Sequence, residues 1–111
     1  LLKERLGWDD TKIVTTFQSK FGPEEWLKPY TVEEVARLVK EDGKKHIAVI
    51  APAFSADCIE TLEEINEEIK ESFEEAGGDK FLYIPCLNDE PLHIGALCKI
   101  IEDNLAGWIK N

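Results

Sequence analysis

His46-Ile47-Ala48-Val49-Ile50-Ala51 is a continuous apolar run, and such a run predicts a strand that is buried on both faces. The pattern from Asp57 to about Ala76 then predicts a helix that closes at Gly77-Gly78. Phe81-Leu82-Tyr83-Ile84 predicts a second strand after it. A strand, a helix and a strand in this order indicate two parallel strands joined by a right-handed crossover.

The segments upstream extend the same alternation. Ile13-Val14-Thr15-Thr16-Phe17 is rich in β-branched residues and predicts a further strand. Gln18 to Tyr30 contains a glycine and two prolines and predicts a loop, and loops of this length in a compact domain are usually functional. Thr31-Val32-Glu33-Glu34 has the pattern of a capping box that opens a helix to about residue 41. Leu1 to Leu6 predicts the end of a helix that stops at the following glycine.

Downstream, Leu87 to Pro91 predicts the start of the last helix, with the proline in its tolerated first turn. Apolar residues then recur at helical spacing, namely Ile94, Leu97, Cys98, Ile101, Leu105 and Trp108. The order is β-α-β-α-β-α after a short N-terminal helix end, which predicts an α/β fold with three α/β/α layers and a parallel sheet. Ligands of such sheets bind beyond the carboxyl ends of the strands, where Gln18 to Tyr30 and Ala51 to Glu60 lie.

Composition narrows the classes of function. The 111 residues are enough for one domain, and the net charge of −10 argues against nucleic acid as a partner. Three cysteines without a C-x-x-C pair argue against a disulfide framework or a zinc knuckle and favour a reducing compartment. No run is long enough to span a bilayer and no signal peptide opens the chain. The absence of methionine, including an initiator, indicates numbering that begins inside a longer protein.

The helix predicted from Asp57 carries an unusual stripe of glutamates. Its expected core face, at 100° per residue, comprises Cys58, Ile59, Leu62, Ile65, Ile69 and Phe73. A separate stripe comprises Glu60, Glu64, Glu68, Glu71 and Glu75, and each pair of like charges four residues apart costs a helix roughly 0.2–0.5 kcal/mol.

Two interpretations of the stripe remain open. It is a solvated outer face behind a capping box at Asp57-x-x-Glu60, or it faces a cleft and passes hydrated cations toward Glu60. Carboxylate oxygens suit labile binding of ferrous iron. Cys58 is interpreted as a packed small hydrophobe, and neither His46 nor His93 has another histidine or cysteine at ligand spacing, so no histidine metal site is expected in this chain.

Two stretches resemble the ferrochelatase family. Thr16-Phe17-Gln18-Ser19-Lys20-Phe21-Gly22-Pro23-Glu24-Glu25-Trp26-Leu27-Lys28-Pro29-Tyr30-Thr31 is similar to the family's Q-S-[KR]-x-G-x-x-x-W-L-x-P segment. Pro52-Ala53-Phe54-Ser55-Ala56-Asp57-Cys58-Ile59-Glu60-Thr61-Leu62-Glu63-Glu64 is similar to its F-x-[SA]-D-x-[IL]-E-T-L-x-E signature. The resemblance covers essentially the whole chain and implies a C-terminal chelatase-like domain, residues 1–111, of a longer two-domain enzyme.

The resemblance also implies roles for single residues. Glu60 matches a metal-site or proton-accepting carboxylate that faces the porphyrin, and Glu64 and Glu68 match acidic positions along a metal or proton path, on a helix with a locally widened turn. Positions near the macrocycle are matched by Ser19, Phe21, Trp26 and Phe54. For Trp26 and Phe54, simple anchoring of the loops is the alternative.

Partners and location follow from the same resemblance. The substrates would be ferrous iron and a porphyrin, and the family's catalytic histidine would come from an N-terminal half that this chain lacks. The cysteines that bind an iron–sulfur cluster in some members have no counterpart in the tail up to Asn111, so no cofactor is expected. A cytoplasmic location is expected, and a peripheral contact with the inner membrane is left open.

Two other functions remain open. One is a half-size chelatase that dimerises to complete its cleft, for which His46 and His93 are poorly placed. The other is a non-catalytic acidic module that binds metal or a partner, which explains the glutamate stripe but not the loop from Gln18 to Thr31.

Overall fold

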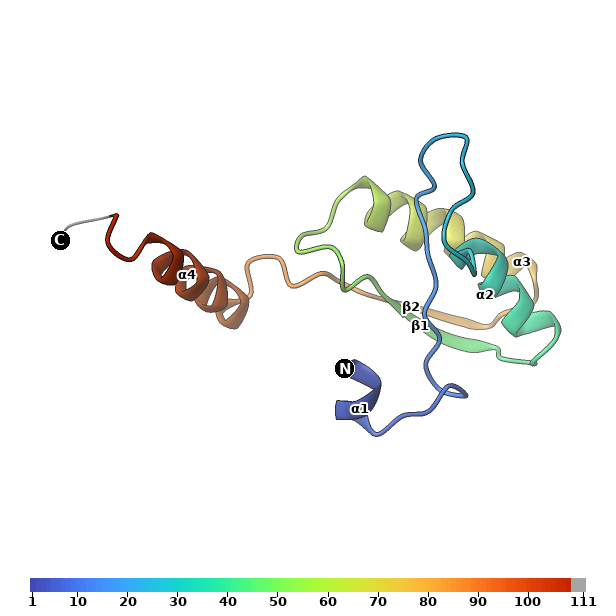
Figure 1. The fold of residues 1–111 in the computed structure, drawn as a ribbon. Helices are drawn as coiled ribbons and strands as arrows, with labels where there is room; N and C mark the ends of the chain where they lie inside the picture. Colours follow the sequence, from blue (N-terminus) through green and yellow to red (C-terminus); the bar gives the residue numbers. More distant parts are fainter. Residues whose placement is uncertain (109–111) are drawn as a thin grey trace.

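The computed structural model describes residues 1–108 (Figure 1). Its elements, in chain order, are α1 (Leu2–Leu6), α2 (Thr31–Lys40), β1 (His46–Ile50), the π-helix η1 (Glu60–Ile69), α3 (Lys70–Glu75), β2 (Lys80–Ile84) and α4 (Pro91–Leu105). β1 and β2 are parallel, and the register pairs His46 with Lys80 and Ile50 with Ile84. The α/β class and the parallel strand–helix–strand unit predicted from the sequence are therefore confirmed.

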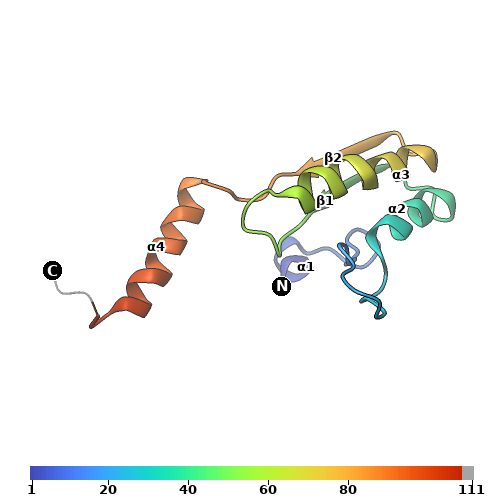
Figure 2. The same ribbon diagram turned by 90° about the horizontal axis from the view of Figure 1, so that it is seen from above.

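Helices cover one face of the sheet. Residues of both strands alternate between exposed and half-buried, and the half-buried side chains of Ile47, Val49, Phe81 and Tyr83 pack on the core. The opposite face, with Ile50, Leu82 and Ile84, is exposed, so β1 is not buried on both faces as its apolar run predicts. Figures 1 and 2 show α2, η1 and α3 on the same side of the strands. The described residues therefore form two layers, one of helices and one of strands, where the sequence predicts three.

The core lies between that sheet face and the three helices. Its buried hydrophobic residues are Val35, Val39, Ala51, Ile65, Ile69 and Phe73. The ring of Phe73 meets that of Phe81 at a centroid distance of 5.8 Å and an interplanar angle of 53°. Gly78 comes so close that a Cβ there would lie 2.3 Å from the Phe73 ring. The glycine predicted to close the helix therefore also makes room for the largest core side chain.

The register of η1 differs from that of an α-helix. Thr61, Ile65 and Ile69 are buried, whereas Ile59 and Leu62, expected in the core, are 69% and 50% exposed. A π-helix bonds each residue to the one five positions away and holds more than 3.6 residues in a turn. Positions four apart therefore stay closer to one face than an α-helix allows.

The segment from Ile13 to Phe17 does not form the expected strand. Phe17 and Tyr30 make an isolated parallel bridge, in which Phe17 N donates to Pro29 O at 2.9 Å and Thr31 N donates to Phe17 O at 2.9 Å. A strand needs a continuous neighbour for its backbone groups, and these contacts supply one bridge only. The bridge instead joins the two ends of the loop between these residues.

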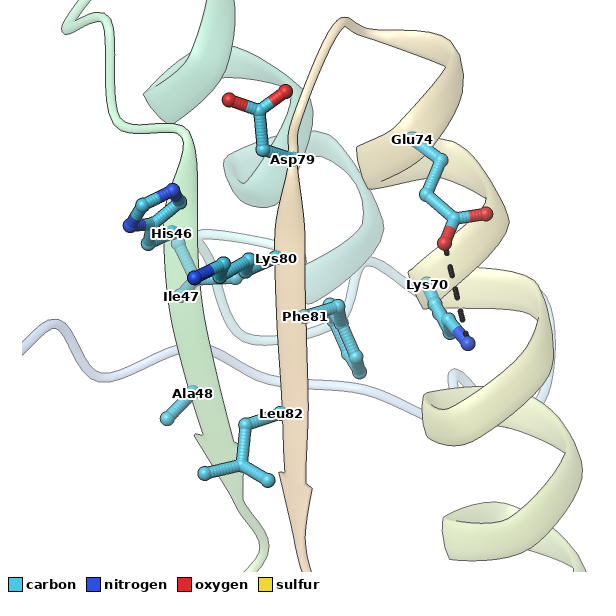
Figure 3. A pocket seen from close by; sticks show the side chains of 9 residues that line it. All are labelled: His46, Ile47, Ala48, Lys70, Glu74, Asp79, Lys80, Phe81 and Leu82. Atoms are coloured by element: carbon cyan, nitrogen blue, oxygen red, sulfur yellow. Dashed lines mark ion pairs between the residues drawn. The ribbon is translucent and has the colours of Figure 1, made fainter.

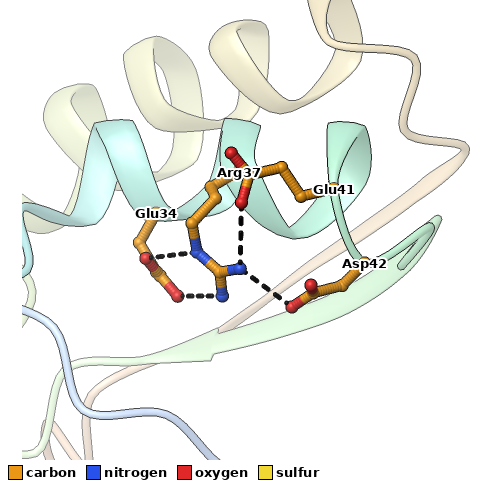
Figure 4. A network of polar contacts seen from close by, with 4 residues as sticks. All are labelled: Glu34, Arg37, Glu41 and Asp42. Carbon is orange, nitrogen blue, oxygen red and sulfur yellow. Dashed lines mark hydrogen bonds and ion pairs between the residues drawn. The ribbon is translucent and has the colours of Figure 1, made fainter.

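The start of α2 also differs from its prediction. Its N-cap is Tyr30, and the Thr31 hydroxyl donates to Thr16 Oγ1 at 2.8 Å, so the expected capping box at Thr31 is wrong. Glu34 pairs instead with Arg37, whose Nε and Nη2 donate to its two oxygens at 3.0 and 2.7 Å. Figure 4 shows Arg37 also facing two acidic side chains at the end of the helix, Glu41 at 3.6 Å and Asp42 at 3.1 Å. This network joins the buried Glu34 of α2 to the two acidic residues that follow the helix.

The two ends of the chain lie outside the core. α1 ends at Gly7, whose φ of 65° is left-handed, as expected of a helix stop. Pro91 opens α4 as predicted, but the helix ends at Leu105 and Trp108 lies beyond it. α4 extends away from the sheet (Figures 1 and 2). Among the described residues, no helix is both long and apolar enough to cross a membrane, and residues 109–111 of the predicted domain lie outside this description.

Candidate functional site

A hollow of about 310 Å³ separates the start of η1 from the loop after Phe17. Ser19, Lys20 and Phe21 line it from the loop, and Ile59, Glu60, Glu63, Glu64 and Glu68 line it from the helix. η1, which provides most of its lining, begins after the loop that leaves the carboxyl end of β1. The structure therefore brings together Glu60, Glu64, Glu68, Ser19 and Phe21, which the sequence singles out separately.

A larger hollow, of about 700 Å³, lies toward the amino-terminal ends of the strands (Figure 3). Charges of both signs surround it, including Lys80, Asp79 and the Lys70–Glu74 ion pair at 3.9 Å. His46 is the histidine at its rim. None of the predicted site residues lines this hollow, so the candidate site is the smaller one.

Glu60 is half-buried at the first position of η1. Its Oε2 accepts a hydrogen bond from Cys58 Sγ at 3.0 Å, and its backbone carbonyl accepts one from Gln18 Nε2 at 2.9 Å. The Cys58 thiol, aided by the residue's own backbone N–H, lowers the pKa of the Glu60 carboxyl. Burial alone would raise this pKa, but the hydrogen bonds to the carboxylate outweigh it. Cys58 is therefore a hydrogen-bond donor rather than only a packed hydrophobe.

Glu64 lies four residues further along η1 and contacts the loop directly. Ser19 N donates to its Oε1 at 2.7 Å, and Ser19 Oγ donates to its Oε2 at 2.5 Å. Glu68 lines the same hollow four residues beyond. Because turns of η1 are wide, the three carboxylates follow one another along the hollow.

The aromatic residues predicted near the macrocycle have different surroundings. Phe21 lines the hollow and is 87% exposed. Trp26 is half-buried and its indole N–H donates to Gln18 O at 3.0 Å, so it braces the loop. Phe54 packs against the core, and its N–H donates to Ala51 O at 3.1 Å in the turn after β1. Of these three, Phe21 alone lines the hollow among the described residues.

Asp57 is the centre of a polar network that the sequence does not reveal. Asn88 Nδ2 donates to Asp57 Oδ2 and Asp57 N donates to Asn88 Oδ1, both at 2.8 Å. Thr61 Oγ1 donates to Asp57 Oδ1 at 2.9 Å, and the Tyr83 hydroxyl donates to the same oxygen. The helix has Ile59 as its N-cap, so the capping box expected at Asp57-x-x-Glu60 is wrong.

The network shifts the pKa values of its titratable groups. Hydrogen bonds from Asn88 and then Tyr83 hold the pKa of Asp57 well below its usual range. Burial, with the bond to Asp57, raises the pKa of Tyr83, and burial also raises that of the Cys86 thiol. Asn88 lies 31 residues from Asp57 in the chain, and no local spacing signals such a pair. The network ties the loop after β2 to the loop after β1.

The histidines stay outside the hollow. His93 Nε2 lies 3.2 Å from Ser55 Oγ and its Nδ1 lies 2.8 Å from Asn88 O, while His46 is exposed at the start of β1. Within residues 1–108, no group of three histidine, cysteine or acidic side chains is arranged to hold a metal ion. Glu60, Glu64 and Glu68 therefore form a series along the helix rather than a closed cage.

Known proteins match this chain over nearly its whole length. The ferrochelatase family profile matches residues 1–105. The ferrochelatase of Rhodobacter capsulatus is 70% identical over 109 residues, which cover 98% of this chain and 31% of that protein. That of Marinobacter nauticus is 57% identical, covering 97% and 29%, and that of Allorhizobium ampelinum is 56% identical, covering 98% and 31%.

The match falls on the C-terminal part of these relatives, and the chain spans about a third of their length. It includes both stretches on which the resemblance rests, residues 16–31 and 52–64. The resemblance is thereby confirmed, and the chain belongs to the ferrochelatase family.

Proposed function

We propose that this chain is the C-terminal domain of a longer ferrochelatase, which inserts ferrous iron into a porphyrin during heme biosynthesis. Membership of the family supports the reaction. The position of the Glu60 carboxylate is the observation that supports a part for this domain in the reaction. This carboxylate lines a hollow between η1 and the loop at Ser19.

Glu60 is proposed as the catalytic carboxylate. Insertion of iron releases two pyrrole protons from the porphyrin and exchanges the hydration shell of the ion for four ring nitrogens. A carboxyl group with a lowered pKa is ionised at neutral pH, and it then only accepts hydrogen bonds, protons or cations. The negative charge suits a group that holds the arriving iron, whereas the lowered pKa makes Glu60 a weaker acceptor of a pyrrole proton than an ordinary glutamate.

Glu64 and Glu68 are proposed to bring iron to Glu60. Hard carboxylate oxygens bind ferrous iron without the tight hold that thiolates give to soft metals. The two side chains line the same hollow as Glu60 at intervals of four residues. Such an open series allows an ion to pass from one carboxylate to the next, as an iron substrate requires.

The loop is proposed to meet the porphyrin. Phe21 presents an exposed aromatic ring at the rim of the hollow, and a flat macrocycle covers such a ring by stacking. Ser19 lines the hollow beside it. Trp26 and Phe54 are proposed to shape this surface by holding the loop and the turn after β1.

The remaining partners are also proposals. An N-terminal half would oppose Glu60 across the cleft and supply the catalytic histidine. The domain itself would need no resident cofactor and no iron–sulfur cluster, and the enzyme would work in the cytoplasm, with a peripheral membrane contact left open.

The substitution Glu60→Gln in the full-length enzyme tests this function. It removes the charge and the proton-accepting oxygen while it keeps the shape of the side chain. We expect iron insertion to be abolished and porphyrin binding, followed by absorbance of the bound macrocycle, to survive. Glu67→Gln, on the exposed side of the same helix, is the matched control and should retain turnover. Near-normal turnover of Glu60→Gln would remove Glu60 from the mechanism.

A further inference from the structure

Both oxygens of Glu64 are occupied by a single loop residue. The Ser19 amide donates to Oε1 at 2.7 Å and the Ser19 hydroxyl to Oε2 at 2.5 Å. The two residues are 45 positions apart in the chain, so this contact joins two distant segments. Hydrogen bonds to a charged acceptor are the strong ones among those in proteins. Ser19 therefore holds Glu64 in a two-point clamp.

The backbone of Ser19 indicates that this clamp shapes the loop. Its φ of 59° lies in the left-handed region, which residues other than glycine rarely adopt. Such a conformation persists when surrounding contacts hold it. Here the Glu64 carboxylate takes both polar groups that Ser19 presents toward the helix.

Hydrogen bonds of the neighbouring residue Gln18 also hold the loop against η1. Gln18 Nε2 donates to Glu60 O at 2.9 Å, and Gln18 O accepts from Trp26 Nε1 at 3.0 Å. The residue after the clamp is Lys20 and the next is Phe21, and both line the hollow. The backbone conformation of Ser19 therefore determines where Phe21 lies in the hollow relative to Glu60.

We propose that Glu64 is a positioning residue, whose clamp on Ser19 sets the loop over the hollow and must open when a cation occupies Glu64. The Ser19 amide and hydroxyl belong to one residue and bridge the two oxygens of Glu64 from one side, and an ion held by both oxygens at once needs that same side. Binding of a cation at Glu64 therefore weakens the hydrogen bonds to Ser19, and by linkage these hydrogen bonds weaken cation binding to the same extent. Arrival of a cation at Glu64 then frees Ser19 and lets Phe21 move. The inference rests on the proposed function for the identity of the cation and of the molecule that the loop meets.

Hydrogen exchange of the Ser19 amide measures the clamp directly. In the full-length protein, we expect Glu64→Ala to speed exchange in the peptide that holds Ser19 by about tenfold or more. Glu64→Gln retains one acceptor oxygen and should keep part of the protection. Glu68→Ala alters the next carboxylate of the stripe and should leave Ser19 as protected as before. Equal protection in wild type and in both Glu64 variants would show that Glu64 does not hold the loop.

Zn²⁺ alone tests the competition, because it is a divalent ion without redox chemistry. Titration of the wild-type protein should speed exchange at Ser19 up to the rate of Glu64→Ala. Glu64→Ala itself should show no further change with the ion. Ser19 protection that is unaffected by Zn²⁺ at every concentration would reject the coupling. Neither readout requires turnover, so loss of activity in Glu60→Gln bears on the proposed function and not on this inference.

Steady-state kinetics separate positioning from a general structural role. Glu64→Ala should raise KM for the porphyrin more than it lowers kcat, and Glu64→Gln should rescue part of that rise. Both Glu64→Ala and Glu68→Ala should weaken the dependence on iron, but Glu68→Ala should leave KM for the porphyrin unchanged. Equal effects of the two alanine variants on both substrates would contradict a specific link between Glu64 and the loop.

Discussion

Glu60 shows how one neighbouring side chain sets the state of a carboxylate. Cys58 is two residues earlier, and its thiol donates to Glu60 Oε2 at 3.0 Å. A donor that points at the charged form lowers the pKa, and the hollow is open enough for burial to oppose it only weakly. The sequence predicts the carboxylate at this position, but it does not predict the sign of the pKa shift. That sign depends on the rotamer of a cysteine that the apolar pattern assigns to the core.

The low pKa of Asp57 leads us to expect that the stability of the fold decreases at acidic pH. Its folded pKa lies below the ordinary 3.8, so its contribution is present above that value and is lost as the pH falls toward the folded pKa. The urea midpoint of the wild-type chain should therefore fall steeply below about pH 4. In Asp57→Asn the midpoint should be lower at pH 7 and its fall with acid should be shallower.

Asp89→Asn is the control for that measurement, since Asp89 is an exposed acid on the loop next to Asn88. It removes one negative charge from the same loop, outside the network around Asp57. Its midpoint should follow the wild-type curve from pH 7 to pH 3. Identical curves for wild type and Asp57→Asn would mean that the network does not stabilise the fold.

At the scale of elements, the π-helix explains both a success and a failure of the sequence pattern. Hydrophobic periodicity places Ile65, Ile69 and Phe73 in the core, and all three are buried. It also places Ile59 and Leu62 there, and both are exposed because the turn in η1 is wider than 3.6 residues. Thr61, fully buried, takes the place that the α-helical pattern gives to an apolar residue.

The same argument applies to the capping boxes. Local spacing predicts one at Thr31 and one at Asp57, and neither forms. Thr31 bonds to Thr16 across the loop, and Asp57 bonds to Asn88 beyond β2. Distant partners compete with local caps, and sequence spacing carries no information about them. Residues of the hollow were predictable through the family motifs, whereas the network that supports them was not.

A pair of alanine substitutions tests the register of η1. Ile65→Ala removes a fully buried side chain and should lower the free energy of unfolding by about 2–5 kcal/mol. Leu62→Ala, three residues earlier and half exposed, should lower it by about 0.5 kcal/mol or less. Urea denaturation followed by circular dichroism measures both. An ordinary α-helical register would make the two losses similar, so comparable values would rule out the wide turn.

At the scale of the whole molecule, the chain is more open than its size requires. Its radius of gyration is 17.5 Å, whereas a compact domain of a hundred residues has about 13 Å. Its accessible surface is 8745 Å², compared with roughly 6,200 Å² expected for a compact protein of the same mass. The excess comes from α4, which stands apart, and from the uncovered face of the sheet (Figures 1 and 2). The third layer is missing because no helix among the described residues covers that face.

The uncovered face predicts that the 111-residue chain associates with itself. Ile50, Leu82 and Ile84 expose apolar surface side by side on neighbouring strands, and contiguous apolar patches drive association. The net charge of −10 opposes it, since two copies repel. Salt shortens the range of that repulsion to about 10 Å at 0.1 M and about 3 Å at 1 M, so association should grow with ionic strength.

Leu82→Lys should shift this equilibrium toward the monomer, because it places a charge at the most exposed residue of the patch. Leu27→Lys is the matched control: it makes the same substitution at an exposed leucine in the loop and adds the same charge to the molecule. Sedimentation velocity at low and high salt distinguishes the two variants. If both shift equally, net charge rather than the sheet face governs association. If the wild-type chain stays monomeric at 1 M salt, the uncovered face is not adhesive, and solution scattering should then give a radius of gyration near 17.5 Å.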